Sequence, residues 1–498
     1  MSAEFLIMAC LVVPLVGGGV ILATGSKPNL RETMTLLTAC LLFFFVALIV
    51  PLVAAGERPS ITLLEMLPGL NITFTIEPLG MVFACVASFL WIVTTIYAIG
   101  YMRGHHEVNQ TRFYFYFAIA ISSAMGIAFA GNMMTLFIFY EVLTLSTFPL
   151  VTHHGTEESK KAGRVYLGIL IGTSVGFLLF AIVWTYALTG TLDFTEGGIL
   201  AGKAEKPVIA VLLLLYMFGI GKAALMPFHR WLPAAMVAPT PVSALLHAVA
   251  VVKAGVFTVI KVIVYLFGID TLNGTIGATV LAVIAAITLL LSAMIAMRKD
   301  NLKARLAYST ISQLSYIVLG AAMATGAGVI AAGMHIVMHA TAKITLFFCA
   351  GAILVASHKT QISQLNGIGR RMPITMICFL IGSLGIIGLP PAGGALSKWY
   401  LMMGAAEADQ IIFMFVWMTS SLLSAAYLLP IVYRAFFLAP TKGDDHSSGD
   451  ATDDDEGIKE APVFCLIGLG TAAVLTVVAF FMAEDLSKML APLAGKLG

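Results

Sequence analysis

The chain contains 498 residues, of which 59% are hydrophobic and only 11% are charged, and its mean hydropathy is +0.97. A typical soluble domain carries about 25% charged residues, so this composition excludes an ordinary water-facing surface and indicates an integral membrane protein. The 28 Lys and Arg residues nearly balance the 26 Asp and Glu residues, which leaves no basic excess for binding nucleic acid.

Apolar runs long enough to cross a bilayer recur along the whole chain. A hydrocarbon core of about 30 Å requires about 20 helical residues, and these runs are too long for barrel strands. The first run follows Glu4 and is too long for a cleavable signal, so it is predicted to span. The sequence thus predicts an all-α integral membrane protein with about 14 transmembrane helices. They lie near 4–24, 32–54, 78–101, 113–130, 132–151, 163–189, 208–227, 241–267, 273–297, 303–323, 326–356, 372–402, 408–438 and 461–483.

The loops between these runs differ strongly in positive charge. With the N-terminus placed outside, eighteen Lys and Arg residues fall in cytoplasmic loops and five fall in outer loops. This bias predicts an even number of spans with both termini outside the cytoplasm. Residues 441–460 form an acidic, Ser- and Gly-rich cytoplasmic loop before the last span. We interpret this loop as a solvated linker in preference to a docking tail.

Nine ionisable side chains lie inside the predicted spans, where each charge costs roughly 2.5–3.5 kcal/mol at mid-bilayer. Unpaired, they would be too expensive, so they should face the protein interior and contact one another or water. Lys261 lies close to the end of its span, and for it a snorkelling side chain is an equal alternative. The nine residues are Glu141, Lys222, His247, Lys253, Lys261, His335, His339, Lys343 and Lys398.

His335, His339 and Lys343 are spaced at i, i+4 and i+8, which places them on one face of a helix. Imidazole titrates near neutral pH, and burial disfavours the charged form of lysine, so such a row can gain and lose protons. Zinc binding is the rival interpretation, but no nearby Asp, Glu or Cys completes a site. The pattern therefore favours a proton path over a metal site.

Two predicted spans are interrupted next to a lysine. Lys222 lies five residues before Pro227, and Lys398 lies seven residues after Pro391. Proline removes a backbone donor, and irregular backbone at membrane depth is tolerated only where it lines protein or water. Broken helices at comparable places in two halves of a chain indicate a transport site.

Several cofactor classes have no support in the sequence. The six cysteines, Cys10, Cys40, Cys85, Cys349, Cys378 and Cys465, form no C-x-x-C pair, which argues against iron–sulfur clusters, structural zinc and disulfides. No P-loop and no serine-hydrolase G-x-S-x-G motif is present. We therefore expect no cofactor and no metal, and any redox chemistry would have to reside on partner chains.

These residues lie in recognisable motifs. The segment KAALMPFHRWLPAAMVAPTPVSALLHAVAVVKAG at 222–255 resembles the hallmark segment of the antiporter-like subunits of respiratory complex I, Mrp-type Na+/H+ antiporters and membrane-bound hydrogenases. FIFYE at 137–141, RLAYSTISQLSY at 305–316, HATAK at 339–343 and GLPPAGGALSK at 388–398 agree with it. The resemblance covers roughly residues 78–438. It implies two inverted five-helix repeats, helices 4–8 and 9–13, with helices 7 and 12 broken.

The resemblance also implies a division of the chain. N-terminal helices 1–3 occupy 1–110, the first repeat 111–270 and the second repeat 271–440. The acidic loop at 441–460 and the C-terminal helix at 461–498 follow.

The same resemblance implies roles for the buried ionisable groups. Glu141 matches a glutamate that pairs with the lysine of helix 7, here Lys222. His247 and Lys253 match the connecting groups of helix 8. The further matches are His339 and Lys343 for the central relay and Lys398 for the exit. His335 has no counterpart in the family pattern and belongs to the proton path only through its place in the polar row.

The implied function is that of a proton-translocating subunit in a hetero-oligomeric membrane complex, exchanging protons for Na+ as in the D-type component of Mrp antiporters. The alternatives are a proton-pumping subunit of a complex I-like NADH:quinone oxidoreductase or hydrogenase, and the membrane subunit of an inorganic-carbon transporter. The expected partners are other membrane subunits and the lipid bilayer, with no nucleic acid. The expected location is the cell inner membrane. A purely structural scaffold would not retain buried ionisable groups at this cost.

Overall fold

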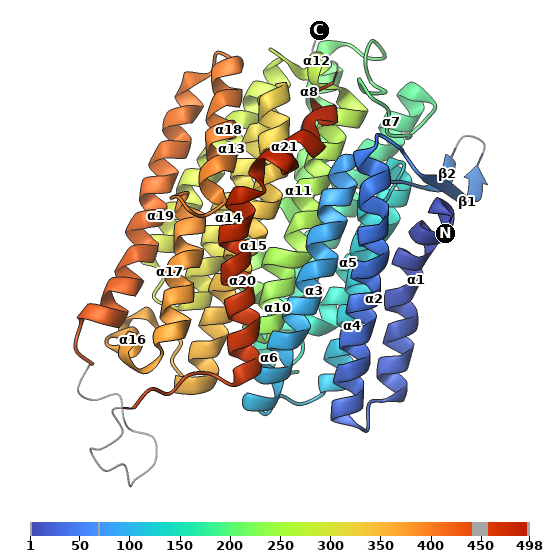
Figure 1. The fold of residues 1–498 in the computed structure, drawn as a ribbon. Coiled ribbons are helices and arrows are strands. Elements are labelled where there is room, and N and C mark those ends of the chain that lie inside the picture. Colours follow the sequence, from blue (N-terminus) through green and yellow to red (C-terminus); the bar gives the residue numbers. More distant parts are fainter. Residues whose placement is uncertain (1, 68–69, 441–456, 496–498) are drawn as a thin grey trace.

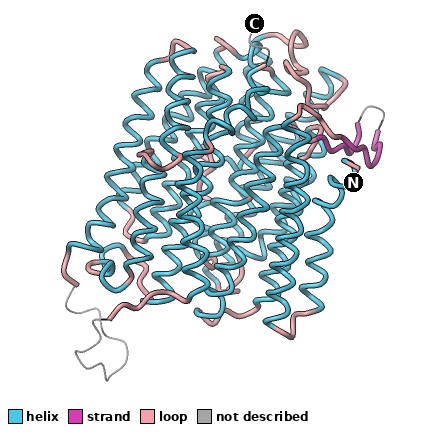
Figure 2. Tube along the Cα trace, in the orientation of Figure 1, coloured by secondary structure: helices cyan, strands magenta, loops and turns pink. Residues whose placement is uncertain are grey.

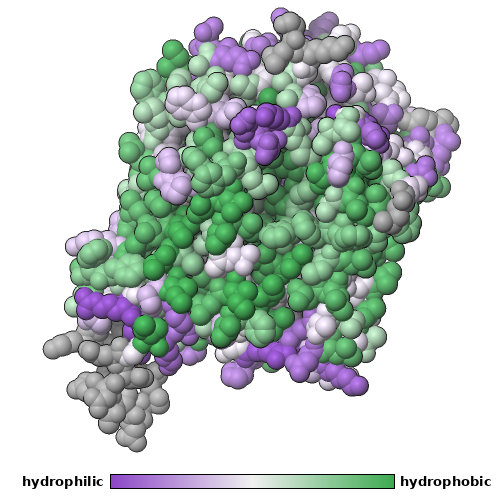
Figure 3. All heavy atoms as spheres, viewed as in Figure 1, coloured by the Kyte–Doolittle hydropathy of each residue, from purple (hydrophilic) through white to green (hydrophobic). Residues whose placement is uncertain are grey.

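The computed structural model describes residues 2–67, 70–440 and 457–495. Long helices run roughly parallel through the whole molecule, and the short strands are confined to one edge (Figures 1 and 2). Ten of the described helices are long and apolar enough to cross a membrane. On the face shown in Figure 3, hydrophobic residues cover the middle of the molecule and hydrophilic residues gather toward both ends. The fold is that of an all-α multi-pass membrane protein.

Each of the fourteen predicted spans coincides with a helix or with a helix in several pieces. The first five are α1 (Ala3–Ala23), α2 (Pro28–Ala54), α3 (Pro78–Gly104), α4 (Gln110–Ala128) and α5 (Met133–Val151). The sixth joins α6 (Glu157–Thr173), the π-turn η1 (Ser174–Leu178) and α7 (Leu179–Thr189), and the seventh begins as α8 (Lys206–Gly219). The eighth joins α10 (Thr240–Ala244), η4 (Leu245–Val249), α11 (Val251–Lys261) and η5 (Val262–Phe267).

The remaining spans are mostly unbroken helices. They are α13 (Ile276–Arg298), α14 (Leu302–Ala322), α15 (Gly326–Ser357), α17 (Pro373–Ile387) with α18 (Gly394–Glu407), α19 (Ile411–Phe437) and α20 (Val463–Phe481). Short pieces complete the chain: η2 (Gly221–Ala223), α9 (Trp231–Ala234), η3 (Ala235–Val237), α12 (Ile269–Leu272), η6 (Ile362–Leu365), α16 (Ile368–Arg371), α21 (Ala483–Leu490) and η7 (Ala491–Ala494).

The two predicted helix breaks are confirmed. After α8 ends at Gly219, the chain makes the single 3₁₀ turn η2 and then irregular backbone. Between α17 and α18, residues 388–393 are not helical. Lys222 lies within the first break, and Lys398 lies shortly after the second. At each break, backbone carbonyls that no longer accept hydrogen bonds within a helix are available to other donors.

Two features were not predicted. An antiparallel hairpin of β1 (Ser60–Leu67) and β2 (Leu70–Thr75) lies between α2 and α3, where alternating Thr and apolar residues favour extended chain.

The acidic segment 441–460 lies mostly outside the described residues. Its described end contributes a cap, because Glu460 Oε1 accepts a hydrogen bond of 2.6 Å from Ile374 N at the start of α17.

Both termini lie toward the same end of the molecule, as an even number of spans requires (Figure 1). The opposite end carries the turn between α1 and α2, the loop between α3 and α4, and the turn between α5 and α6. We call that opposite end the basic face, because the sequence places most of the loop Lys and Arg residues there.

Candidate functional site

Lys222 is fully buried on the 3₁₀ turn that follows the broken end of α8. Its Nζ donates to the Tyr140 carbonyl at 2.8 Å and to Thr144 Oγ1 at 2.5 Å. The same nitrogen lies 3.1 Å from the centre of the Tyr140 ring, a cation–π contact. The close approach of α11 requires Gly255, since an ideal Cβ there would lie 2.4 Å from the carbonyl carbon of Lys222. Helices α5 and α11 therefore hold the lysine in place.

Glu141 lies on α5 between the two residues that hold Lys222. Both of its carboxylate oxygens are buried, and neither has a hydrogen-bond partner among the described residues. Lys222 donates to its neighbours Tyr140 and Thr144 instead. The structure therefore places the predicted partners at one site, with the lysine held by the helix that carries the glutamate and without a direct ion pair.

Lys253 on α11 contacts His339 on α15, and these two helices belong to the two different predicted repeats. Lys253 Nζ lies 2.5 Å from His339 Nδ1, and both residues are buried. A lysine donating to Nδ1 leaves the proton of the neutral imidazole on Nε2. This contact joins side chains 86 positions apart in the sequence.

A further histidine, His247, lies in the π-turn η4, six residues before Lys253. On a regular helix the two would diverge by about 120°. The π-turn, followed by non-helical backbone at Ala250, departs from this regular spacing. The His247 ring packs 4.6 Å from the Phe347 ring, and its two nitrogens have no hydrogen-bond partner in the described chain.

Lys343 is fully buried on α15 and does not face lipid. Its Nζ donates to Ser309 Oγ at 2.8 Å, and the same oxygen accepts the Tyr427 hydroxyl at 2.8 Å. Lys343 therefore contacts a hydroxyl chain between α14 and α19, whereas Lys253 contacts His339. In direct contacts the two lysines thus lie on two separate branches.

His335 bridges α15 to its neighbours. Its Nδ1 lies 2.9 Å from Ser397 Oγ, and its Nε2 lies 3.0 Å from Gln313 Oε1. Its ring also stacks 6.2 Å from the His339 ring. Because Ser397 directly precedes Lys398, His335 connects the central pair to the second helix break.

Lys398 is buried and closes the open end of α17. Its Nζ donates to the carbonyls of Ile386 at 2.7 Å and Ile387 at 3.0 Å, and to Ser421 Oγ at 3.0 Å. It also lies 4.6 Å from the centre of the Tyr316 ring. The break therefore supplies the oxygen ligands of the ammonium, which a regular helix would have used internally.

The snorkelling alternative for Lys261 is wrong. Lys261 is fully buried, and its ammonium is paired inside the protein instead of reaching the membrane surface. Its Nζ donates to Glu77 Oε1 at 2.7 Å and to the Ala130 carbonyl at 3.1 Å. Sequence reasoning missed Glu77, which lies just before Pro78 at the start of α3 and resembles an ordinary loop residue. The feature that could have indicated it is a carboxylate directly before Pro78, the proline that begins a membrane span.

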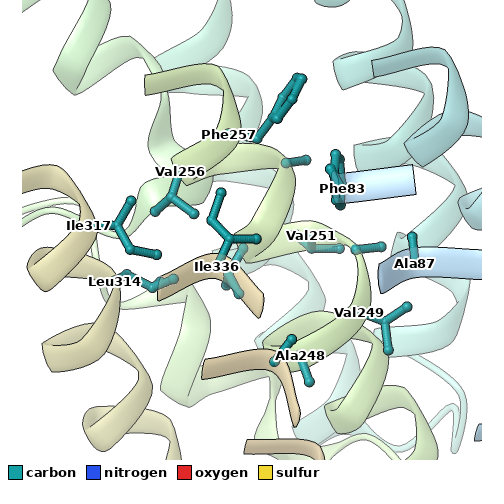
Figure 4. Packing of buried hydrophobic residues seen from close by; sticks show 14 of the residues in the cluster. Phe83, Ala87, Ala248, Val249, Val251, Val256, Phe257, Leu314, Ile317 and Ile336 are labelled. Carbon is teal, nitrogen blue, oxygen red and sulfur yellow. The ribbon is translucent and has the colours of Figure 1, made fainter. Parts of the chain in front are cut away.

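The central contacts lie within a dense apolar shell. Figure 4 shows buried apolar side chains of α3, α11, α14 and α15, the helices α11 and α15 being those that carry Lys253 and His339; among these side chains are Phe83, Val251, Leu314 and Ile336. Within the described ranges, no group of three or more His, Cys, Asp or Glu residues is arranged to hold a metal ion. The site is thus a chain of protonatable groups in a low-dielectric interior.

A family model described as "NADH:quinone oxidoreductase/Mrp antiporter, TM" matches residues 130–424. The chain belongs to this family. A second model, "NADH-Ubiquinone oxidoreductase (complex I), chain 5 N-terminus", matches residues 68–114. The first match spans all eight residues of the proton path predicted from the sequence.

Curated relatives carry names from both branches of the family. NADH-quinone oxidoreductase subunit N of Desulforudis audaxviator is 32% identical over 375 residues, covering 74% of each chain. NAD(P)H-quinone oxidoreductase chain 5 of Synechocystis is 32% identical over 76% of this chain and 56% of that protein. A probable K(+)/H(+) antiporter subunit of Rhizobium meliloti is 31% identical over 79% of this chain, yet the match spans 40% of that protein.

Solved structures share the fold over the full length. A chain of the Mrp complex from Dietzia superposes with a TM-score of 0.87 at 22% identity, covering 100% of this chain and 98% of that chain. A chain of an archaeal membrane-bound sulfane sulfur reductase gives 0.82 at 22% identity, covering 99% and 98%. The fold is therefore common to an antiporter complex and a respiratory complex.

Proposed function

We propose that this chain is a proton-translocating antiporter-like subunit of a multisubunit membrane complex that exchanges a monovalent cation, Na+, for protons. The observation that carries this proposal is the contact between Lys253 and His339, which joins buried protonatable groups from the two halves of the molecule. A purely structural interior would gain nothing from lysines in this position, since each charge is costly to bury.

In the first half, Lys222 is the group that takes up and releases the proton. Its ammonium is held by the Tyr140 carbonyl and Thr144 in the present structure. Movement of the Glu141 carboxylate to the ammonium would favour the charged lysine, and its withdrawal would favour release. Glu141 is therefore the switching partner of Lys222.

In the second half, the proton passes from Lys253 to His339 Nδ1, which leaves a neutral lysine and an imidazolium. His335 and Ser397 then lead to Lys398, the last group before the open end of α17. Lys343 with Ser309 and Tyr427 forms a side branch whose charge biases the central pair. His247 contributes a further protonatable ring on the same span as Lys253.

This assignment of halves corresponds to the division that we propose for the chain, into N-terminal helices, two five-helix repeats, a loop and a final helix. We place the basic face in the cytoplasm and both termini outside it, in the cell inner membrane, because Lys and Arg accumulate on the cytoplasmic side of membrane proteins. The partners would be other membrane subunits, as in the complexes that contain the structural relatives.

A second candidate is a proton-pumping subunit of a complex I-like oxidoreductase or hydrogenase. The quinone oxidoreductase names of several relatives favour it. The membrane subunit of an inorganic-carbon transporter is the third candidate. Cluster-bearing or nickel-containing partners in the purified complex would select the redox pump, and small multi-span partners would select the antiporter.

The proposal is tested by proton flux in proteoliposomes that contain the purified complex. Glu141→Gln should abolish cation-driven proton movement while the complex remains assembled, because the neutral side chain cannot switch the charge of Lys222. Wild-type flux in this variant would refute the role of the chain in translocation.

A further inference from the structure

Glu107 lies in the loop between α3 and α4, at the basic face, and three imidazoles surround its buried carboxylate. Glu107 Oε1 lies 3.1 Å from His105 Nδ1, and His154 Nε2 lies 3.3 Å from the same carboxylate. His153 Nε2 lies 3.8 Å from Oε2. His153 and His154 follow α5 directly, so two loops build this cluster, which we call the Glu107 cluster.

The Glu107 cluster communicates with solvent. An open cleft of about 1080 Å³, lined by Glu107 together with Arg31, Arg112 and Tyr116, reaches the carboxylate from the basic face. The side chain of His154 is 34% exposed, whereas that of His153 is 1% exposed. The cluster thus extends from water to the buried end of α5.

The charges in the cluster are mutually dependent. Burial alone would raise the pKa of Glu107, but the hydrogen bond from His154 and the neighbouring imidazoles lower it. The hydrogen bond to Glu107 raises the pKa of His154, while burial lowers the pKa of His153. Arg31, Arg103, His106 and Arg112 line the same cleft as Glu107. Arg112 also donates to the His153 carbonyl, and Lys303, a further charged group near the cluster, donates to the Ala238 carbonyl.

Hydroxyl groups on α5 extend from Lys222 toward this cluster. At about 100° per residue, Tyr140, Thr144 and Thr147 fall within about 60° of one another on the helix. Thr144 accepts from Lys222, and Thr147 Oγ1 is hydrogen-bonded to Tyr166 OH at 2.6 Å. This polar stripe ends at Thr147.

The next position of the stripe is apolar. Val151, fully buried, lies four residues beyond Thr147, or about 6 Å along the helix, and two residues before His153. On this face of α5, buried Val151 therefore lies between Thr147 and the loop that carries His153. An apolar layer blocks protons when dry and passes them when a few water molecules enter it.

We propose that the Glu107 cluster is the proton-uptake site for Lys222 on the basic face, connected to it by the α5 hydroxyl stripe and gated at Val151. This inference rests on the proposed function and adds the route by which protons reach the first half. The rival explanation is structural, namely that the cluster only ties the two loops together. It predicts an effect on stability and none on the pH dependence of flux.

The test is proton flux through the assembled complex in proteoliposomes at a series of pH values on the basic side. Thr147→Val removes a hydroxyl without changing the side-chain shape and should lower flux by at least about tenfold. Thr147→Ser should retain the flux, because it keeps the hydroxyl. Thr152→Val is the matched control, since Thr152 also bonds to a helix carbonyl but lies off the stripe.

The cluster is tested separately with His154→Ala, which should slow proton uptake and shift its pH profile. Millimolar imidazole on the basic side should restore the rate, which a structural role does not predict. Wild-type flux and pH profile in both Thr147→Val and His154→Ala would overturn this inference. If Glu141→Gln is inactive in that case, the proposed function stands and only the uptake route through the Glu107 cluster is wrong. If Glu141→Gln is active, the proposed function itself fails.

Discussion

Replacing Lys398 by Arg separates a proton carrier from a fixed positive charge. Arg shares the lysine stem as far as Cδ and keeps the charge, so it can still donate to the carbonyls of Ile386 and Ile387 that hold the ammonium. Lys398→Met, by contrast, would leave these acceptors buried and unpaired, at about 1–3 kcal/mol for each. Arginine is therefore the variant that preserves the local structure while it changes the chemistry.

The magnitude of the effect follows from the proton affinity of the guanidinium. The pKa of a guanidinium lies far above neutral pH, so its deprotonation at about pH 7.5 costs about 7 kcal/mol and leaves roughly one molecule in 10⁵ neutral. A path that requires Lys398 to release its proton should slow by at least about a hundredfold in Lys398→Arg. An interfacial anchor needs only charge and length, so it would tolerate the change.

The assay is proton flux in proteoliposomes, with the amount of assembled complex determined in parallel. Lys488→Arg is the matched control, because Lys488 is exposed and pairs only with Glu484 on the surface. Full flux in Lys398→Arg, with Lys488→Arg also unchanged, would refute proton release at Lys398.

Two further predictions concern stability. Glu77→Gln should destabilise the protein by about 3–5 kcal/mol, because it leaves the Lys261 ammonium buried without its carboxylate, and adding Lys261→Met should recover part of the loss, as measured by thermal unfolding. For His154, whose pKa is raised above 6.5 by Glu107, the contribution to stability is complete below pH 6.5 and is lost as the pH rises through the folded pKa. The melting temperature of wild type should therefore exceed that of His154→Gln most clearly between about pH 5 and 6.5 and converge with it near pH 9; a constant difference would contradict this linkage.

The membrane spans and the helix breaks could be predicted because their signals are local. The cost of placing a lysine in lipid indicated an interior position for Lys222, Lys253, Lys343 and Lys398 before any contact was known. Proline next to Lys222 and Lys398 marked the breaks in the same way. Buried lysines and nearby prolines can both be recognised in a short stretch of sequence, and the structure has the buried positions and the helix breaks that they predict.

The pairing of the buried groups could not be predicted in the same way. Lys261 and Glu77 are 184 positions apart, and nothing local indicates that α3 and α11 bring them together. Lys343 finds Ser309 rather than the central histidines because α14 packs against this part of α15. The Glu107 cluster likewise arises from two loops, each of which has the sequence of an ordinary polar turn.

Lys253→Met tests the central claim most directly, because Lys253 forms the contact between the two halves. Proton flux through the assembled complex should be measured against wild type and against Lys488→Met, which removes an exposed lysine. A connected proton path predicts that Lys253→Met loses flux to background while Lys488→Met retains it. Wild-type flux in assembled Lys253→Met would contradict the proposal that protons cross the molecule through this contact.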